Sequence, residues 1–412
     1  MSRVRYAYVT AALIDVLNAA FILCFPYIAL TLNAGTAGTA ANFIGAASYA
    51  LWCWVFSRIR LFRERRHTIA AGCAVVALAA MVLGGFPSVP MLLAAPAVFS
   101  LGNALIFPAM QAWFTEGMDQ PRLVRAMGGY SFAWVSGYLV GPLAAGWILN
   151  HTPGTPPTEL AHRIALLLNT AAAILLLVGA SFLPDMFAHH PGASPRVDPA
   201  APTHIHRVPP RTITCFMHLT WVSIFGAMYA TGLVRFVFTE LAKAEGIGSR
   251  SVGAVNAVMY ASLLILVFLL RTRTDWLFRF RWIAAVQLAA IPAIGLFAFG
   301  NRMHHFLGGA ALLGLLQGFI QFSSSTYSLL LEKTRDRFIA VNEAMLGGGG
   351  FFAGLSGWLL ARHLSVRAGF TLGVAVMALL LAVEGAVYLW WRRTEHFGAP
   401  SLHATEEKPM PT

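Results

Sequence analysis

Charge is scarce in this sequence: Asp, Glu, Lys and Arg together make up 11% of its 412 residues, whereas hydrophobic residues make up 58%. Soluble globular domains carry about 25% charged residues, so a water-soluble fold is excluded. The charges gather in short segments between apolar stretches of about 20 residues, the length that a helix needs to cross about 30 Å of hydrocarbon. Because a lone strand or loop cannot satisfy its backbone in lipid, we predict an all-α, multi-pass integral membrane protein.

About twelve membrane-spanning helices are expected from the apolar stretches. Their approximate ranges are 7–32, 38–57, 69–87, 91–114, 127–149, 162–184, 213–238, 252–270, 282–299, 305–330, 339–362 and 368–391.

Cysteine is also scarce, with four residues in the whole chain. Cys24, Cys53, Cys73 and Cys215 lie far apart in apolar segments and lack the spacing of metal ligands, so they are expected to be buried free thiols. The sequence contains no nucleophile elbow and no metal-binding helix motif, and its histidines lie apart from any recognisable acid–base set. Neither a metal nor a cofactor is therefore expected, and the chain is not expected to be an enzyme.

The formal net charge of +12 is unevenly distributed. With the N-terminus inside the cell, about 22 of the 29 Lys and Arg residues fall in cytoplasmic segments, as the positive-inside rule requires. We therefore expect cytoplasmic termini and a location in the plasma (bacterial inner) membrane. Contact with anionic lipid of the bilayer accounts for the positive charge, and nucleic acid is not expected as a partner.

Two parts of the chain resemble each other. Arg58-Ile59-Arg60 and Arg271-Thr272-Arg273 each follow a long apolar run, and Ser136-Gly137-Tyr138 has a counterpart in Ser356-Gly357-Trp358. The separation is close to half the chain in both cases. A duplicated unit with a basic loop at equivalent points is typical of secondary transporters.

The duplication predicts four parts. Six-helix bundles are expected at residues 1–184 and 212–392, with a cytoplasmic tail at 393–412. The segment 185–211 between the bundles is rich in Pro, Ala and His and has no apolar period, so it is expected to be a disordered cytoplasmic linker.

With these features the chain resembles the major facilitator superfamily over essentially its whole length. The family has twelve spans in two halves, a cytoplasmic linker, and a basic loop after helix 2 that is repeated after helix 8. Its loop signature, roughly G-x-L-x-D-x-x-G-R-R, falls on Ser57, Ile59, Leu61, Glu64, Arg65 and Arg66. Both glycines and the aspartate of the signature are replaced, so the carboxylate that helps to close the cytoplasmic side in the family has no counterpart at Leu61.

The fifth predicted helix carries a motif of small residues. Gly137, Gly141, Pro142 and Gly146 resemble the G-x-x-x-G-P-x-x-G-G signature that the family shows most often in exporters. Small residues at a spacing of four allow close helix approach, and proline can bend the helix. The motif favours export over import, with ordinary packing as the alternative. The glycines from Gly347 to Gly350 indicate close packing or a hinge in the eleventh helix.

In the resembled family, helices 1, 4, 7 and 10 line a central cavity, where an unpaired polar group is costly and functional. Polar residues of the matching segments are therefore the candidate substrate residues: Asp15, Asn18, Asn103, Gln111, Trp221, Tyr229, Arg235, Gln317, Gln321, Ser324 and Tyr327. Asp15 is the candidate for proton coupling, because a carboxyl facing the cavity can exchange a proton as access alternates; a structural carboxyl bound to Asn18 is the open alternative. Arg235 could hold an anionic group or pair with Glu240.

A cytoplasmic gate is expected from the placement of charges near the basic loops. Its candidate members are Arg63, Arg65, Arg66, Glu116, Arg279, Glu332 and Glu343. The sequence thus predicts a monomeric secondary transporter of a small-molecule solute that works by alternating access, with export and proton coupling as finer hypotheses. A polytopic membrane enzyme of acyltransferase type, or a receptor or scaffold that does not transport, is the rival interpretation.

Overall fold

The computed structural model describes residues 3–34, 37–59, 64–149, 156–182, 208–247, 249–331 and 334–398, and every regular element in these ranges is a helix. The helices are α1 (Arg3–Thr31), α2 (Ala37–Phe56), α3 (Arg65–Gly85), α4 (Val89–Phe114), α5 (Gln120–Leu149), α6 (Pro157–Ala180), α7 (Pro210–Phe236), α8 (Phe238–Ala244), α9 (Ser249–Leu270), α10 (Phe280–Phe299), α11 (Met303–Leu329), α12 (Arg335–His363) and α13 (Val366–Gly398). The predicted all-α membrane fold is confirmed.

Twelve of these helices are long, and the seven-residue α8 is the exception. Eleven are long and apolar enough to cross a membrane, and the twelfth, α2, contains the shorter apolar stretch Ala40–Phe56. At 1.5 Å per residue, the 20 residues of α2 still span about 30 Å. Two of the predicted domain boundaries fall inside helices: α7 begins at Pro210, within the range expected for the linker, and α13 continues past residue 393 to Gly398.

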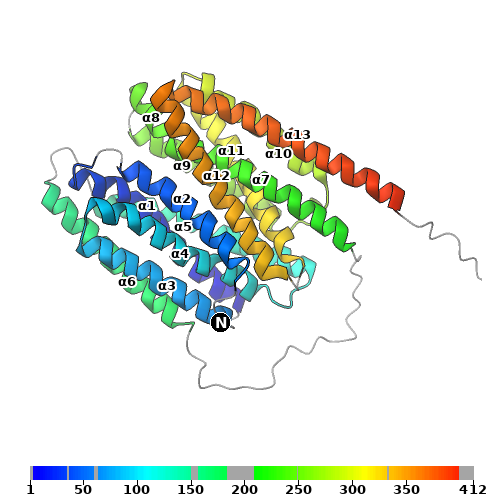
Figure 1. Ribbon diagram of the computed structural model, residues 1–412, viewed down its shortest axis with the longest axis horizontal. Coiled ribbons are helices and arrows are strands. Elements are labelled where there is room, and N and C mark those ends of the chain that lie inside the picture. The colour runs from blue at the N-terminus through cyan, green and yellow to red at the C-terminus, as the bar shows by residue number, and fades with distance from the viewer. Residues whose placement is uncertain are drawn as a thin grey trace, which may run out of the picture.

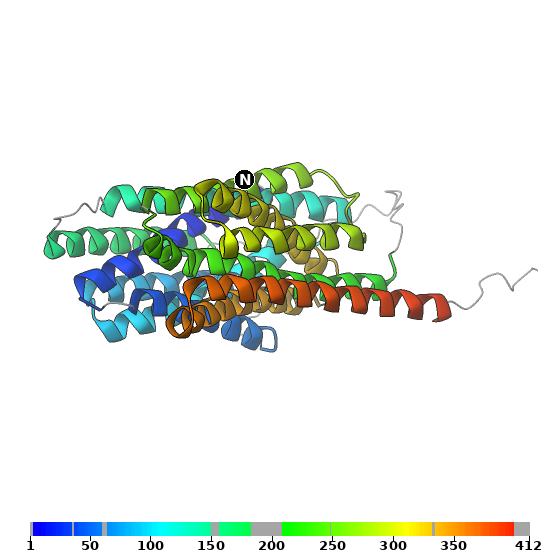
Figure 2. The ribbon, with the colours of Figure 1, turned by 90° about the horizontal axis from the view of Figure 1, so that it is seen from above.

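The helices form two side-by-side groups, one of α1–α6 and one of α7–α13 (Figure 1). Within the first group, α1 packs on α5 and α3 packs on α4 and α6; within the second, α7 packs on α12 and α9 packs on α11. We call these groups the N-bundle and the C-bundle. They meet where α12 packs on α2 and α4, and where α5 packs on α9 and α11 (Figure 2 gives the view from above).

Close packing inside the bundles depends on small residues. A Cβ added at Gly72 of α3 would lie 2.7 Å from the carbonyl oxygen of Gly102 in α4, and one added at Gly102 would lie 2.8 Å from the carbonyl oxygen of Gly72. Since real side-chain carbons do not approach so closely, the two helices can cross here only as glycine on glycine.

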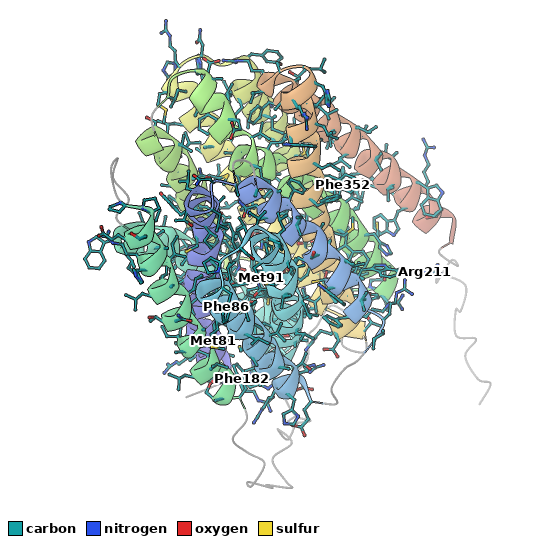
Figure 3. The ribbon with its side chains drawn as sticks, turned by 60° about the vertical axis from the view of Figure 1, so that its left-hand side comes forward. Met81, Phe86, Met91, Phe182, Arg211 and Phe352 are labelled. Atoms are coloured by element: carbon teal, nitrogen blue, oxygen red, sulfur yellow. The ribbon has the colours of Figure 1, made fainter. Side chains whose placement is uncertain are left out.

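Large apolar side chains cover the outside of the molecule. Met81, Phe86, Met91 and Phe352 are exposed (Figure 3), and Trp147 is 84% exposed. Such a surface is unstable in water but matches lipid, which has the same polarity as these side chains. The polar side chains that concern function must then be sought between the bundles.

Candidate functional site

A cavity of about 740 Å³ lies between the two bundles. Helices α1, α2, α4 and α5 line it from the N-bundle, and α7, α9, α11 and α12 line it from the C-bundle. This volume is within the range of pockets for drug-sized ligands, about 300–1,000 Å³. Seven of the predicted substrate residues line it: Asp15, Asn18, Asn103, Gln111, Arg235, Gln317 and Gln321.

Polar atoms without partners mark the N-bundle wall. Asp15 is 2% exposed and lies beside Asn18, one turn further along α1. Within the described ranges, Asp15 Oδ2, both amide atoms of Asn18 and Asn103 Oδ1 are buried and form no hydrogen bond of ordinary geometry. Buried polar groups normally have partners, so a solute or water in the cavity would complete this wall.

Glu343 connects the two bundles inside the cavity. It extends from α12, and its Oε2 accepts a hydrogen bond of 2.9 Å from the Tyr49 hydroxyl of α2, while its Oε1 accepts one of 2.8 Å from Gln111 Nε2 of α4. The residue is 6% exposed. The sequence interpretation assigned Glu343 to the gate near the basic loops; the structure places it among the residues lining the cavity.

Arg235 lies near the end of α7 and faces the C-bundle side of the cavity. Its Nη2 donates to Gln317 Oε1 at 3.2 Å, and its guanidinium carbon lies 5.3 Å from the centre of the Tyr260 ring. Gln317 in turn donates to Gln321 Oε1 at 3.3 Å, which fixes the orientation of its amide. Among the described residues, no carboxylate lies within ion-pair distance of Arg235.

Four predicted substrate residues do not line the cavity. Trp221 Nε1 donates to Ser328 Oγ at 3.0 Å, and the Tyr229 hydroxyl lies 3.0 Å from Ser356 Oγ of α12. Ser324 donates to the backbone of its own helix. The Tyr327 hydroxyl accepts a 2.7 Å bond from the Phe278 N–H and so supports the second basic loop.

Aromatic residues that the sequence interpretation did not select complete the cavity wall. Tyr138 of α5 and Tyr260 of α9 stack across the bundles, with ring centres 6.0 Å apart and an interplanar angle of 25°. Trp134 packs edge-on against Tyr138, and Tyr130 and Tyr49 also line the cavity. These residues lie on α2, α5 and α9. The sequence search was restricted to predicted helices 1, 4, 7 and 10, which are α1, α4, α7 and α11 in the structure, and so missed them.

The cavity is closed at the end of the molecule that carries the basic loops. Met127 and Gln111, its lining residues nearest that end, are 1% and 3% exposed. Leu143, which lines the cavity near the opposite end of α5, is 70% exposed, and Ile22 is 43% exposed. Both exposed side chains belong to the half of the cavity away from the basic loops.

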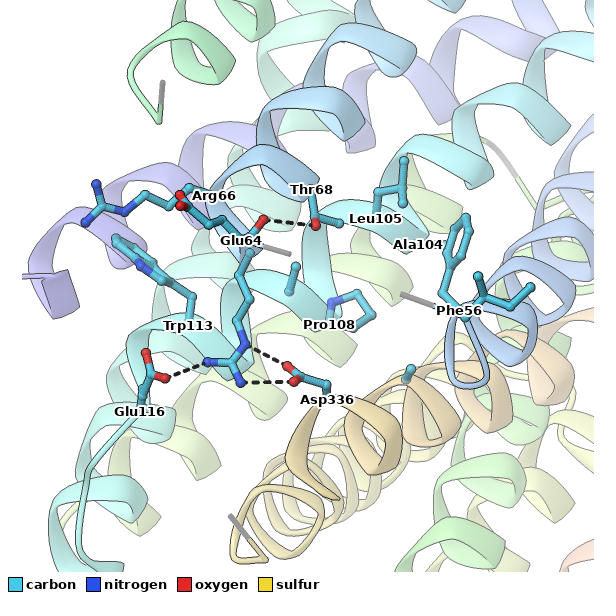
Figure 4. Close-up of a pocket in the computed structure, with 14 residues that line it drawn as sticks. Phe56, Glu64, Arg66, Thr68, Ala104, Leu105, Pro108, Trp113, Glu116 and Asp336 are labelled. Atoms are coloured by element: carbon cyan, nitrogen blue, oxygen red, sulfur yellow. Dashed lines mark hydrogen bonds and ion pairs between the residues drawn. The ribbon is translucent and has the colours of Figure 1, made fainter. Parts of the chain in front are cut away.

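A cluster of charges holds the closed end together (Figure 4). Arg65 at the start of α3 binds Asp336 of α12 through two hydrogen bonds of 2.7 and 3.0 Å, and its Nη1 lies 3.2 Å from Glu116 Oε1. Glu116 also lies 3.7 Å from Arg3. Arg335, 4% exposed, donates at 2.7 Å to the Thr115 carbonyl at the end of α4 and at 3.0 Å to the Leu329 carbonyl at the end of α11. The Arg65–Asp336 pair and the bond from Arg335 to the Thr115 carbonyl join the two bundles.

Of the other predicted gate residues, some lie outside the described ranges and some lie near the charge cluster or on the surface. Arg63 and Glu332 lie outside the described residues. The Arg66 guanidinium lies 5.8 Å from the centre of the Trp113 ring in the same cluster. Arg279 is exposed at the start of α10 and forms no ion pair within the described ranges. Asp336 and Arg335 supply the contacts from the C-bundle.

The predicted small-residue positions lie at close helix contacts. A Cβ at Gly137 or Gly141 of α5 would meet the backbone of α1, at 2.5 Å from the Ala12 oxygen and 2.4 Å from the Val16 oxygen respectively. Gly347 approaches Ala50 of α2 in the same way. Gly350 is buried against Ala46 with room for a methyl group, and the environments of Pro142 and Gly146 are outside the described set.

A third buried carboxylate lies away from the cavity. Glu384 of α13 is fully buried, and Gln287 Nε2 of α10 donates to both of its oxygens, at 2.5 and 2.6 Å. The Ser223 hydroxyl of α7 donates to Glu384 Oε1 at 2.9 Å. All three residues belong to the C-bundle. No cluster of His, Cys, Asp or Glu that could hold a metal occurs in the part of the chain that the structure describes.

Comparisons with known proteins agree with this architecture. The model of the Major Facilitator Superfamily matches residues 7–333. Among solved structures, the human organic anion transporter MFSD10 (TETRAN) has a TM-score of 0.66 at 12% identity, covering 92% of this chain and 98% of that one. The fucose:proton symporter FucP of E. coli, in a variant form, has a TM-score of 0.63 at 14% identity, covering 94% and 99%. FucP in the outward conformation has a TM-score of 0.62 at 14% identity, covering 93% and 98%. No curated protein matches the chain.

Proposed function

Since this chain belongs to the major facilitator superfamily and is a secondary transporter rather than an enzyme, we propose that it moves a small solute by alternating access and that protons drive the movement. The solute would occupy the cavity between the N-bundle and the C-bundle. Rocking of one bundle against the other would then expose the cavity to each side of the membrane in turn.

The observation that carries the coupling proposal is the position of Glu343. An ionised carboxylate accepts two charge-assisted hydrogen bonds, here from Tyr49 and Gln111 of the opposite bundle. A protonated carboxyl has no charge and less acceptor capacity, so the bonds from Tyr49 and Gln111 lose their charge assistance. Proton uptake would therefore weaken a bond between the two bodies that must separate, which is what coupling requires.

Asp15 would be the second proton-binding group. It lines the same cavity from the N-bundle, next to the Asn18 amide. Because its Oδ2 has no partner of ordinary geometry among the described residues, a proton or a solute donor could occupy that position. Asp15 and Glu343 would then share the titration of the cavity.

The ion pairs at the closed end would serve as the gate on the cytoplasmic side. The family's loop aspartate is replaced by Leu61, and its place in the charge network would be taken by Glu116, just after α4, and Asp336 of α12, both bound to Arg65. Arg335 would add bonds that a rocking motion must break. This placement assumes cytoplasmic termini and basic loops, as the positive-inside rule predicts.

Export is the direction that the α5 motif favours. The packing of Gly137 and Gly141 on α1 accounts for these glycines by helix contact alone, so the support for export comes from the motif's resemblance. Uptake of solute into inside-out vesicles, compared with right-side-out vesicles, tests the direction.

The function itself is tested by flux through the purified protein in liposomes. A solute that stabilises the protein against heat should accumulate under an imposed pH gradient and exchange in counterflow without one. Asp15→Asn should lower the stimulation by the pH gradient at least threefold while counterflow continues. If none of the tested solutes exchanges in counterflow, transport is contradicted. If the pH gradient stimulates flux in Asp15→Asn as much as in the unmodified protein, Asp15 has no role in coupling.

A further inference from the structure

The charge that the cavity presents to a solute is that of Arg235. Of the cavity-lining residues, Arg235 is the one that carries a permanent positive charge. It is partly exposed, whereas the two carboxylates that line the same cavity, Asp15 and Glu343, are 2% and 6% exposed.

The carboxylates are less available to a solute than the guanidinium. Both oxygens of Glu343 already accept hydrogen bonds from the N-bundle. Asp15 also lines the cavity, but its side chain is 2% exposed and lies beside the Asn18 amide. A cationic solute would therefore find no exposed counter-charge.

Arg235 has neutral contacts where a cation at this depth usually has an anion. Its contacts are the Gln317 amide oxygen and the face of the Tyr260 ring, and its Nε is buried without a hydrogen bond. Removing a guanidinium from water is costly unless its charge and its donors are satisfied. The planar group also has donors arranged to bind a carboxylate through two parallel hydrogen bonds. An anion bound to the exposed part of the guanidinium would supply the missing negative charge.

Aromatic rings next to the guanidinium define the rest of the solute. Tyr260 lies under Arg235 and stacks on Tyr138, which Trp134 supports from the side. Flat apolar surface is favourable against such rings. The volume of about 740 Å³ exceeds what a small inorganic anion would fill.

From these four features we infer that the cavity binds an organic monoanion, a carboxylate or sulfonate carried on a flat apolar body, with the anionic group on Arg235 and the body against Tyr138 and Tyr260. The inference names the class of solute for the proposed transporter. That this solute is transported rests on the proposed function, whereas its binding in the cavity can be tested separately.

Binding to the purified full-length protein in detergent tests the inference with three probes of one shape: 2-naphthoate, 2-naphthamide and 2-naphthylmethylamine. Quenching of intrinsic tryptophan fluorescence gives the dissociation constants. We expect 2-naphthoate to bind at least tenfold more tightly than the neutral amide, and the cationic amine to bind more weakly than either.

Variants locate the charge that selects the anion. Arg235→Gln should remove the preference for naphthoate over naphthamide and leave the amide affinity within twofold. Arg235→Lys should keep a weakened preference. Arg281→Gln, which changes an exposed arginine in the first turn of α10, should leave all three affinities unchanged.

Three results would overturn the inference: tightest binding of the amine, a naphthoate preference that survives in Arg235→Gln, or no binding of any probe to protein with an unchanged melting curve. Transport is scored separately by counterflow. Naphthoate binding without flux of any solute would contradict the transporter proposal alone, and flux of a cation or neutral solute without naphthoate binding would contradict the inference alone.

Discussion

Glu343 and Glu384 are both buried carboxylates in the C-bundle, yet their partners lie in different bodies. Glu384 is bound by Gln287 and Ser223 of its own bundle. Glu343 is bound by Tyr49 and Gln111, which belong to the opposite bundle. A buried acid is energetically costly and needs hydrogen-bond partners. When the partners lie in the same bundle, the acid stabilises that bundle. When they lie in the opposite bundle, its hydrogen bonds must break as the bundles separate.

The largest expected effect concerns the acid inside the bundle. Glu384→Ala removes the carboxylate that accepts from Gln287 and Ser223 in a site that water does not reach, and it leaves the Gln287 amide only the Ser223 oxygen as an acceptor. This change should lower the free energy of unfolding by about 3 kcal/mol. Glu343→Ala, whose partners face the open cavity, should lower it by about 1 kcal/mol. Thermal melting in detergent measures both, and equal losses would remove the distinction between the two sites.

The next effect concerns transport. Glu343→Gln should reduce proton-driven flux at least tenfold, because the amide keeps the shape but cannot titrate. Its oxygen can accept from Tyr49, and its NH2 can donate to Gln111 Oε1, which has no partner, once the Gln111 amide flips. Glu384→Gln should stay within twofold of the unmodified protein, since Gln287 Oε1 is buried without a partner and can accept from the new amide after its own amide flips. Liposome flux under a pH gradient compares the two variants. Retained coupling in Glu343→Gln would assign proton binding elsewhere.

A smaller effect is expected from removing one hydrogen-bond donor at each site. Tyr49→Phe deletes a donor to Glu343 and leaves Gln111, so it should change proton-driven flux about threefold with little loss of stability. Ser223→Ala deletes a donor to Glu384 and should lower the free energy of unfolding by about 1 kcal/mol without changing flux. Measuring both quantities on both variants is decisive, because the opposite pattern would exchange the two roles.

The smallest effect concerns the surface ion pairs, of which one joins the two bundles and one lies within a single bundle. Arg65 and Asp336 join the bundles and are 25% and 30% exposed, whereas Arg122 and Asp119 form a pair beside α5 alone. Exposed pairs contribute about 0–1 kcal/mol, so Asp336→Asn should increase maleimide labelling of a cysteine placed at Ala340 about twofold to fivefold. Arg122→Gln is the control and should leave labelling unchanged. Equal labelling in both variants would exclude the Arg65–Asp336 pair from the gate.

Much of the fold was predictable because hydropathy and helix length are local properties. The site was only partly predictable, and α12 explains one difference. Its first turn, Arg335-Asp336-Arg337, is polar, so hydropathy placed the start of the helix at residue 339 and left Glu343 near the gate. The helix begins at Arg335, which places Glu343 two turns inside, at the depth of the cavity.

The aromatic wall illustrates the second limit. Tyr138 and Tyr260 lie about 120 residues apart in different bundles, and nothing near either residue indicates that they stack. The same holds for Glu384, whose partners on α7 and α10 come from distant segments.

The sequence by itself determined the solvent, the helices, their approximate ends and the duplicated plan, because each depends on the composition of one continuous segment. The tertiary structure decided which buried acid faces the cavity, which one is enclosed in a bundle, and which cation meets the solute. Those properties depend on the rotation of each helix and on its neighbours, and helices of nearly uniform apolarity carry no local signal for either.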